Sequence, residues 1–421
     1  MPTEPTFKFF IDNINNPVNP QNEIWKTCLP VNRNRPVKQI KTENNRDITY
    51  GDYFKAVGRF LEHDSFADLS SIISRRLGMD IGHKKINEIS VYLVKHGAFY
   101  HPAKVEIYIK NIKLQFVLNV ALSTFGRTIL LKEYNILQKL NNNFPFSFFP
   151  AIYEYGEVSL PKTVQKKTGQ KESGRKAGLL LGEWLDGFNE FHLTTDPDNQ
   201  KQRIIVWDSV NGNYYLSTGE TLELYTQAAM ILTCYYNIET FEQIFPWHHA
   251  AGDFVVKKKN DGIDLKLITA RQYESMVSSS ADANLQETDT NSILEGLLIF
   301  FLNLSIRMRL DRIDGVGDTA WADDVAVAGT FKGFMNGLSI NGLAMNCLGI
   351  KPENNIFPDA LDKYLNNLLF SCNKQDLLDL MINIVASYDT RSPEISIIKQ
   401  NLTRHAEVLH HVINNAHRRS L

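Results

Sequence analysis

The residues of this 421-residue chain with the clearest chemical potential lie in the sequence HHAAGD, residues 248 to 253. Two histidines, His248 and His249, come shortly before the carboxylate of Asp253, and imidazole and carboxylate groups are the usual general acids and bases of proteins. Gly252 lacks a Cβ and so lets the backbone approach another group closely. The segment is therefore a candidate catalytic loop. The alternative is that Asp253 only closes the turn into the next strand, which aspartate does well.

The elements on both sides of this loop must hold it in place. Upstream, residues 217–236 are largely apolar and begin with a Ser-Thr pair followed by a glutamate, which is a helix-capping signal. Downstream, two β-type segments at residues 254–259 and 263–269 are separated by the sequence NDG, a tight-turn signal. The sequence predicts a long helix, a loop and a β-hairpin, in that order.

The first half of the chain has a different residue pattern, which is typical of strands. β-Branched and aromatic residues predict five strands, at residues 88–94, 103–109, 114–122, 148–158 and 177–185. An amphipathic helix at residues 126–140 separates the third strand from the fourth. After residue 186 the chain is expected to be mainly helical, with helices at residues 217–236, 290–313 and 322–338 and three more between 357 and 416. The expected parts are residues 1–85, a helical extension; 86–185, rich in strands; 186–340, mainly helical; and 341–421, further helices packed on the third part.

This order of elements resembles the protein kinase-like superfamily, closest to its aminoglycoside and choline kinase branch, over about residues 86–340. The resemblance implies an α+β bilobal fold, with a five-stranded antiparallel N-lobe that contains one inserted helix and a mainly helical C-lobe. It also implies that ATP and Mg²⁺ bind between the lobes and that Asp253, in the family's GD loop, is the catalytic base.

Three positions depart from the family pattern. Asn119 stands where these kinases carry the lysine that grips the nucleotide phosphates. Lys258 stands in place of the asparagine five residues after the base, and Thr269 in place of the aspartate that holds the metal. Phosphoryl transfer depends on cations that neutralise the charge on the phosphate oxygens, so these losses predict slow chemistry.

Other residues occupy positions that match the family pattern or could replace the missing lysine. Glu133 takes the position of the glutamate that pairs with the missing lysine, and Lys104 or Lys95 is the expected substitute partner. Gly97 marks the place of the phosphate-covering loop, although the family has three glycines there. Glu183, at the end of the fifth strand, completes the residues expected to bind the nucleotide.

Two interpretations of function follow. The first is an atypical ATP-dependent phosphotransferase that acts on an unknown small-molecule or protein substrate. The second is a pseudokinase-like binding or scaffolding protein that has kept the fold without phosphotransfer activity. The glycine and aspartate of the GD loop, together with Glu133, favour the first interpretation, whereas Asn119 and Thr269 favour the second.

Composition excludes some classes of function. The chain has 45 basic and 47 acidic side chains and a net charge of −2, so no overall field would attract nucleic acid. The apolar run at residues 297–306 is too short to span a membrane. Four scattered cysteines without a CxxC pair, and an N-terminus without a signal sequence, predict a cytoplasmic protein. The charged run at residues 305–318 predicts salt-bridged helix packing or, alternatively, side chains that line the ligand site.

Overall fold

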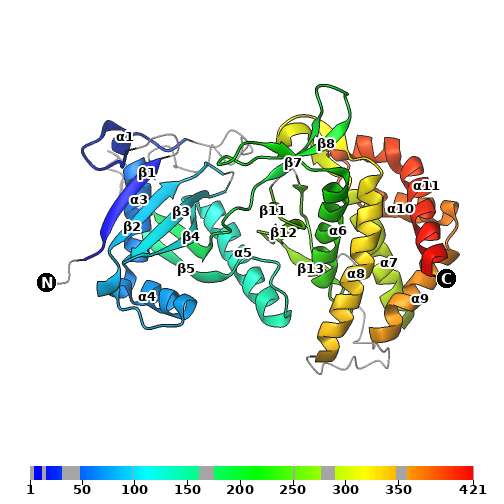
Figure 1. The fold of residues 1–421 in the computed structure, drawn as a ribbon, viewed down its shortest axis with the longest axis horizontal. Helices are drawn as coiled ribbons and strands as arrows, with labels where there is room; N and C mark the ends of the chain where they lie inside the picture. The colour runs from blue at the N-terminus through cyan, green and yellow to red at the C-terminus, as the bar shows by residue number, and fades with distance from the viewer. Residues whose placement is uncertain are drawn as a thin grey trace, which may run out of the picture. The chain divides into compact units, whose positions relative to one another are not determined.

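The computed structural model describes residues 4–11, 16–30, 48–97, 99–160, 175–249, 252–275, 290–347 and 358–420. The chain forms two compact units (Figure 1). Unit 1 comprises residues 1–138 and 150–186, and unit 2 comprises residues 139–149 and 187–421. Helix α5 (Thr124–Asn143) therefore begins in unit 1 and ends in unit 2. The expected α+β class is confirmed.

Unit 1 is built on one sheet. Its strands are β1 (Thr6–Ile11), β2 (Glu88–Leu93), β3 (His101–Ile109), β4 (Ile112–Ala121), β5 (Ile152–Ser159) and β6 (Lys176–Glu183). Their order is β1-β2-β3-β4-β6-β5, and α5 lies between β4 and β5 in the sequence. The five strands and the helix expected from the sequence are confirmed.

The sheet has six strands rather than the expected five, because β1 was missed. This strand lies in the extension that was expected to be helical, and it pairs with β2 in parallel register from Thr6 opposite Glu88 to Ile11 opposite Leu93. A six-residue edge strand carries little periodic signal of its own. Its pairing depends on a sheet that forms more than 70 residues later in the chain.

Two helices, α3 (Tyr50–Leu61) and α4 (His63–Leu77), cover the apolar face of this sheet. The strands alternate as half-buried strands must, so that residues such as Val105 and Phe116 point into the core and pack with Phe54 of α3. Helix α3 begins with a capping box in which Thr49 and Asp52 bond to each other's backbone N–H groups. The short elements α1 (Glu23–Lys26) and η2 (His83–Lys85) complete the unit.

Unit 2 is organised around two helices that lie close together, α6 (Thr218–Cys234) and α8 (Val325–Cys347). Glycines on α8 permit this approach, since a Cβ at Gly333 would lie 2.1 Å from the carbonyl oxygen of Thr226 on α6. The remaining helices are α7 (Thr290–Arg307), α9 (Pro358–Ser371), α10 (Lys374–Ala386) and α11 (Glu394–Ser420). Among the described residues, no helix is both long and apolar enough to cross a membrane.

After residue 186 the described chain has more residues in helices than in strands, as expected, but the segment directly after residue 186 forms a sheet that the sequence analysis missed. A three-stranded sheet is formed there by β7 (Phe191–Thr195), β8 (Gln202–Val206) and β9 (Tyr214–Tyr215). Two further short pairs are β10 (Glu242–Ile244) with β13 (Tyr273–Ser275), and β14 (Leu310–Arg312) with β15 (Thr319–Trp321), with η4 (Ile313–Gly315) after β14. The helix expected over residues 290–313 thus ends at Arg307, because the chain turns there to form β14.

The hairpin expected after the GD loop is confirmed. Strands β11 (Phe254–Lys259) and β12 (Gly262–Leu267) pair in antiparallel register, with Lys259 opposite Gly262 across a two-residue turn. Gly262 has φ of 124°, a value that L side chains rarely adopt, so the glycine of NDG is required for this turn.

Candidate functional site

The carboxylate of Asp253 is buried at the start of the β11–β12 hairpin and is fully engaged. Only 1% of the residue is exposed. Its Oδ2 accepts a hydrogen bond of 2.8 Å from the backbone N–H of His248. The guanidinium of Arg271, from the segment after β12, donates to both carboxylate oxygens in a bidentate ion pair. Gly252, with φ of 65°, makes the left-handed turn that brings the loop into this position.

This pairing restricts what Asp253 can do chemically. A general base needs an oxygen lone pair within about 3 Å of the proton that it removes. A bidentate guanidinium occupies both oxygens with strong charge-assisted hydrogen bonds and compensates the negative charge. In this arrangement Asp253 ties its loop to the segment that follows the hairpin. This arrangement corresponds to the turn-closing role that the sequence left open as the alternative to catalysis.

His248 belongs to a second charged group. The Nη1 of Arg307, at the end of α7, lies 2.6 Å from Oε2 of Glu394 at the start of α11, and its Nη2 lies 3.1 Å from Nδ1 of His248. Burial and the neighbouring Arg307 lower the pKa of His248 to about 4. The imidazole is therefore neutral at pH 7, and its Nδ1 can accept a hydrogen bond from Arg307.

His249 is a packing residue. It is 3% exposed and lies among aromatic rings, including those of Phe191, Trp247 and Phe254. Its Nε2 is 3.2 Å from Sδ of Met308, and its buried Nδ1 has no hydrogen-bond partner in the part of the chain that the structure describes. Burial lowers the pKa of His249 to about 4, so the ring stays neutral and hidden from solvent.

The first part of the charged run at residues 305–318 is buried and salt-bridged, as one of the two alternatives expected, whereas Arg312, Asp314 and Asp318 are exposed. Arg309 is 4% exposed, donates from Nε to the carbonyl of Ala322 at 2.7 Å, and pairs with Asp324 at 3.0 Å. Asp311 is 5% exposed and accepts a hydrogen bond of 2.8 Å from the backbone N–H of Leu193. These charges are held inside unit 2 by partners of the same unit.

Unit 1 contains the residues expected to bind the nucleotide. Glu133, on α5, is 4% exposed and accepts a hydrogen bond of 3.4 Å from the hydroxyl of Tyr100. Lys104, one of the two lysines expected to pair with it, has another carboxylate partner, because its Nζ lies 3.0 Å from Oε1 of Glu106. The same Nζ lies 5.1 Å from the ring centroid of Trp184. The structure describes Lys95 as well, in the segment between β2 and β3.

Glu106 is a buried anion that the sequence analysis missed. Burial alone would raise its pKa, but hydrogen bonds from Gln115, Tyr108 and Lys104 outweigh burial and lower the pKa to about 2. Lys113 adds a further ion pair at 3.3 Å. Glu106 therefore stays ionised and fixes Lys104 on this face of the sheet. The signal for it was present in the sequence, because Lys104 and Glu106 are two residues apart on a largely apolar strand and so lie on the same face.

The other positions carried over from the resemblance make local contacts. The backbone N–H of Gly97 donates to the carbonyl of Tyr100 at 3.1 Å. Glu183 accepts a hydrogen bond of 3.1 Å from the backbone N–H of Ala151. Asn119 lies on β4 opposite Leu180. The structure therefore places Lys104, Gly97, Glu183 and Glu133 in unit 1 and Asp253 in unit 2.

The positions that depart from the family pattern in unit 2 lie on or after the hairpin. Lys258, on β11, pairs with Glu220 at 3.0 Å, and Thr269, two residues before Arg271, is buried. Sequence reasoning missed Arg271, because no local pattern marks an arginine beyond the end of a hairpin as the partner of an aspartate before it.

Comparison with known proteins gives short matches only. No protein-family model matches the chain. Over 136 residues it is 27% identical to sodium-dependent nutrient amino acid transporter 1 of Drosophila willistoni, a match that covers 30% of this chain and 21% of the transporter. The transporters of the same name from Drosophila erecta and Drosophila persimilis are 25% identical over 160 residues and 24% identical over 161 residues, respectively. Each match covers 35% of this chain, and the chain spans about a quarter of the length of the curated relatives it matches.

Proposed function

We propose that this protein is a divergent kinase-like protein that acts by binding, as a pseudokinase does, and does not transfer phosphate. The observation that carries the proposal is the bidentate ion pair between Arg271 and the buried Asp253. This pair engages the one carboxylate that the kinase-like resemblance assigns as base.

The order of elements within each unit supports the kinase-like part of the proposal. In unit 1, three antiparallel strands are followed by helix α5 and two more strands, in the sheet order β2-β3-β4-β6-β5. In unit 2, the long helix α6 leads to the GD loop and the hairpin. These are the elements that the resemblance requires, although β1 and the sheet of β7, β8 and β9 are additions to it.

The side chains at the positions of the kinase site support the proposal that the protein does not transfer phosphate. A kinase site needs a lysine on the phosphates, a carboxylate on the metal and a free base. Asn119 and Thr269 stand at the first two of these positions, and the base at the third is held by Arg271. Lys104, the expected substitute cation, already compensates the buried carboxylate of Glu106.

The competing proposal is the atypical phosphotransferase, with ATP and Mg²⁺ as cofactors and Asp253 as base. Burial of Glu133 on α5 favours it, because a carboxylate there could orient a lysine toward a nucleotide. In this proposal Arg271 must release Asp253 before each turnover.

An ATP-turnover assay distinguishes the two proposals. Wild type and Asp253→Asn are incubated with ATP and either Mg²⁺ or Mn²⁺, and release of ADP is measured. We expect both proteins to be equally inactive, while a thermal-shift titration reports whether ATP binds. Asp261→Asn, at the exposed tip of the hairpin, is the matched control. Turnover that is present in wild type and in the control but lost in Asp253→Asn would establish the phosphotransferase instead.

A further inference from the structure

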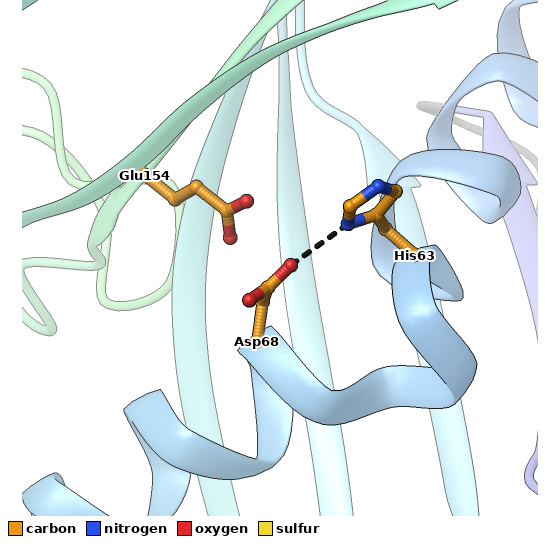
Figure 2. Close-up of side chains that lie close together, drawn as sticks. All are labelled: His63, Asp68 and Glu154. Carbon is orange, nitrogen blue, oxygen red and sulfur yellow. Dashed lines mark hydrogen bonds and ion pairs between the residues drawn. The ribbon is translucent and has the colours of Figure 1, made fainter.

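Three side chains of unit 1 that could bind a metal ion point toward one another (Figure 2). His63 is the first residue of α4, Asp68 lies on the same helix, and Glu154 lies on β5. One nitrogen or oxygen atom from each lies within 4.8 Å of the other two. The Nδ1 of His63 and Oδ2 of Asp68 are 2.8 Å apart. The cluster belongs to neither the GD loop nor the residues expected to bind a nucleotide.

Unusual backbone geometry brings these side chains together. Between His63 and Asp68, three consecutive residues, Asp64, Ser65 and Phe66, have positive φ angles of 45°, 52° and 65°. L-Residues rarely adopt this conformation, and Phe66 is held in it by burial of its ring in the core of unit 1. On β5 the pairing register shifts between Ile152 and Glu154. An irregularity of this kind re-aims a side chain, here that of Glu154.

The charges of the cluster are poorly compensated. Burial, and then the nearby Asp68, raise the pKa of the Glu154 carboxyl. The hydrogen bond that His63 donates to Asp68, together with the charges of Asp68, Glu154 and Asp64, raises the pKa of His63 above its usual 6.5. Within the described ranges, no lysine or arginine forms an ion pair with Asp68 or Glu154. A bound cation would supply the missing positive charge.

We propose that His63, Asp68 and Glu154 form a binding site for a divalent transition-metal ion, with Zn²⁺ as the best fit. One imidazole nitrogen and two carboxylate oxygens suit Zn²⁺, which bonds to such atoms at about 2.0–2.2 Å. Mg²⁺ and Ca²⁺ prefer oxygen ligands alone. The side chains of His63 and Asp68 are 71% and 47% exposed, so water can complete the coordination. The ion would link α4 to β5 across the strained turn.

Metal titration of the full-length chain tests this site. Isothermal titration with Zn²⁺ alone should show one binding event that His63→Gln and Glu154→Gln each weaken by at least about tenfold. The matched controls are His83→Gln and Glu157→Gln. His83 lies in the same unit, and Glu157 lies on the same strand but already pairs with Arg127 and Lys176. Mg²⁺ should bind far more weakly than Zn²⁺.

Three outcomes would overturn the proposal: Zn²⁺ affinity unchanged in both His63→Gln and Glu154→Gln, an equal loss in the two controls, or equal affinity for Mg²⁺ and Zn²⁺. Circular dichroism reports whether each variant folds. If a variant does not fold, NMR of the histidine rings of the wild-type protein tests the site instead. Zn²⁺ should shift the Nδ1 resonance of His63, and this shift should disappear as acid protonates the ring, which faces Asp64, Asp68 and Glu154. A Nδ1 resonance of His63 that Zn²⁺ leaves unmoved contradicts the site.

Discussion

Two groups of charged side chains, around Asp253 and Arg307 in unit 2 and around His63 in unit 1, differ in how their charges are compensated. In unit 2, Asp253 is buried with both oxygens bonded to Arg271, and Arg307 joins Glu394 with His248 beside them. In unit 1, the carboxylates of Asp68 and Glu154 lie near His63 without a lysine or arginine ion pair among the described residues. Buried charges need partners to offset the loss of hydration, whereas exposed charges do not. The first cluster therefore serves the fold, and the second can accept a ligand.

The largest expected effect comes from breaking the buried pair. Arg271→Met leaves the carboxylate of Asp253 buried without a cation, which should lower the free energy of unfolding by about 3 kcal/mol. Chemical denaturation followed by tryptophan fluorescence measures it, since Trp247 lies close to the loop in sequence. The double variant with Asp253→Asn should recover part of the loss. A change below about 1 kcal/mol would mean that solvent compensates Asp253.

A smaller effect is expected when the exposed cluster is filled. Zn²⁺ at about one hundred times its dissociation constant should stabilise the wild-type protein by about 2.7 kcal/mol. Differential scanning calorimetry should show this as a rise in Tm. The rise should be at most about half as large in Glu154→Gln and should be retained in full in Glu157→Gln. An equal rise in both variants would place the ion elsewhere.

The pH dependence of stability should have opposite signs at His249 in unit 2 and at His63 in unit 1. His249 has a folded pKa of about 4, below its usual 6.5, so the unfolded state binds more protons between these values. Its contribution to stability is present above about pH 6.5 and is lost as the pH falls toward 4, with about 1.4 kcal/mol for each unit of pKa difference. The pKa of His63 is raised, so its pair with Asp68 is strongest in acid and is lost as the pH rises through that pKa.

Denaturation at several pH values, in the absence of metal, tests this difference. His249→Leu should reduce the loss of stability in acid, although His248 and His405, whose pKa values are also lowered, retain part of it. His411→Ala, at an exposed position of α11, is the control. If His249→Leu shows the same acid dependence as wild type, the ring is not held neutral by burial.

The smallest effect should follow removal of the exposed imidazole without metal. His63→Gln is expected to change the free energy of unfolding at pH 7.5 by less than about 0.5 kcal/mol, because exposed ion pairs contribute little. Urea denaturation in the presence of a chelator measures this change. A loss above about 1 kcal/mol would show that the His63–Asp68 contact by itself holds the left-handed turn at residues 64–66.

The sequence determined what depends on neighbouring residues. Alternation at residues 103–109, the repeat of apolar residues at 126–140 and the NDG turn at 260–262 predicted β3, α5 and the β11–β12 hairpin, and the structure confirms each of them. These patterns are local because a strand or helix must present one consistent face to the core. The same logic gave salt-bridged packing after the apolar helix as one of two alternatives, and the buried Arg309, which pairs with Asp324, fits that alternative.

Only the tertiary structure decided which distant groups meet. The parallel pairing of β1 with β2, the ion pair of Arg271 with Asp253, and the approach of Glu154 to His63 each join residues that no short pattern connects. The GD motif placed Asp253 at the start of a hairpin, but it could not indicate that a guanidinium would take up both carboxylate oxygens. The free energy of such contacts depends on the loss of hydration and on the packing in the folded chain, and neither exists until the segments come together.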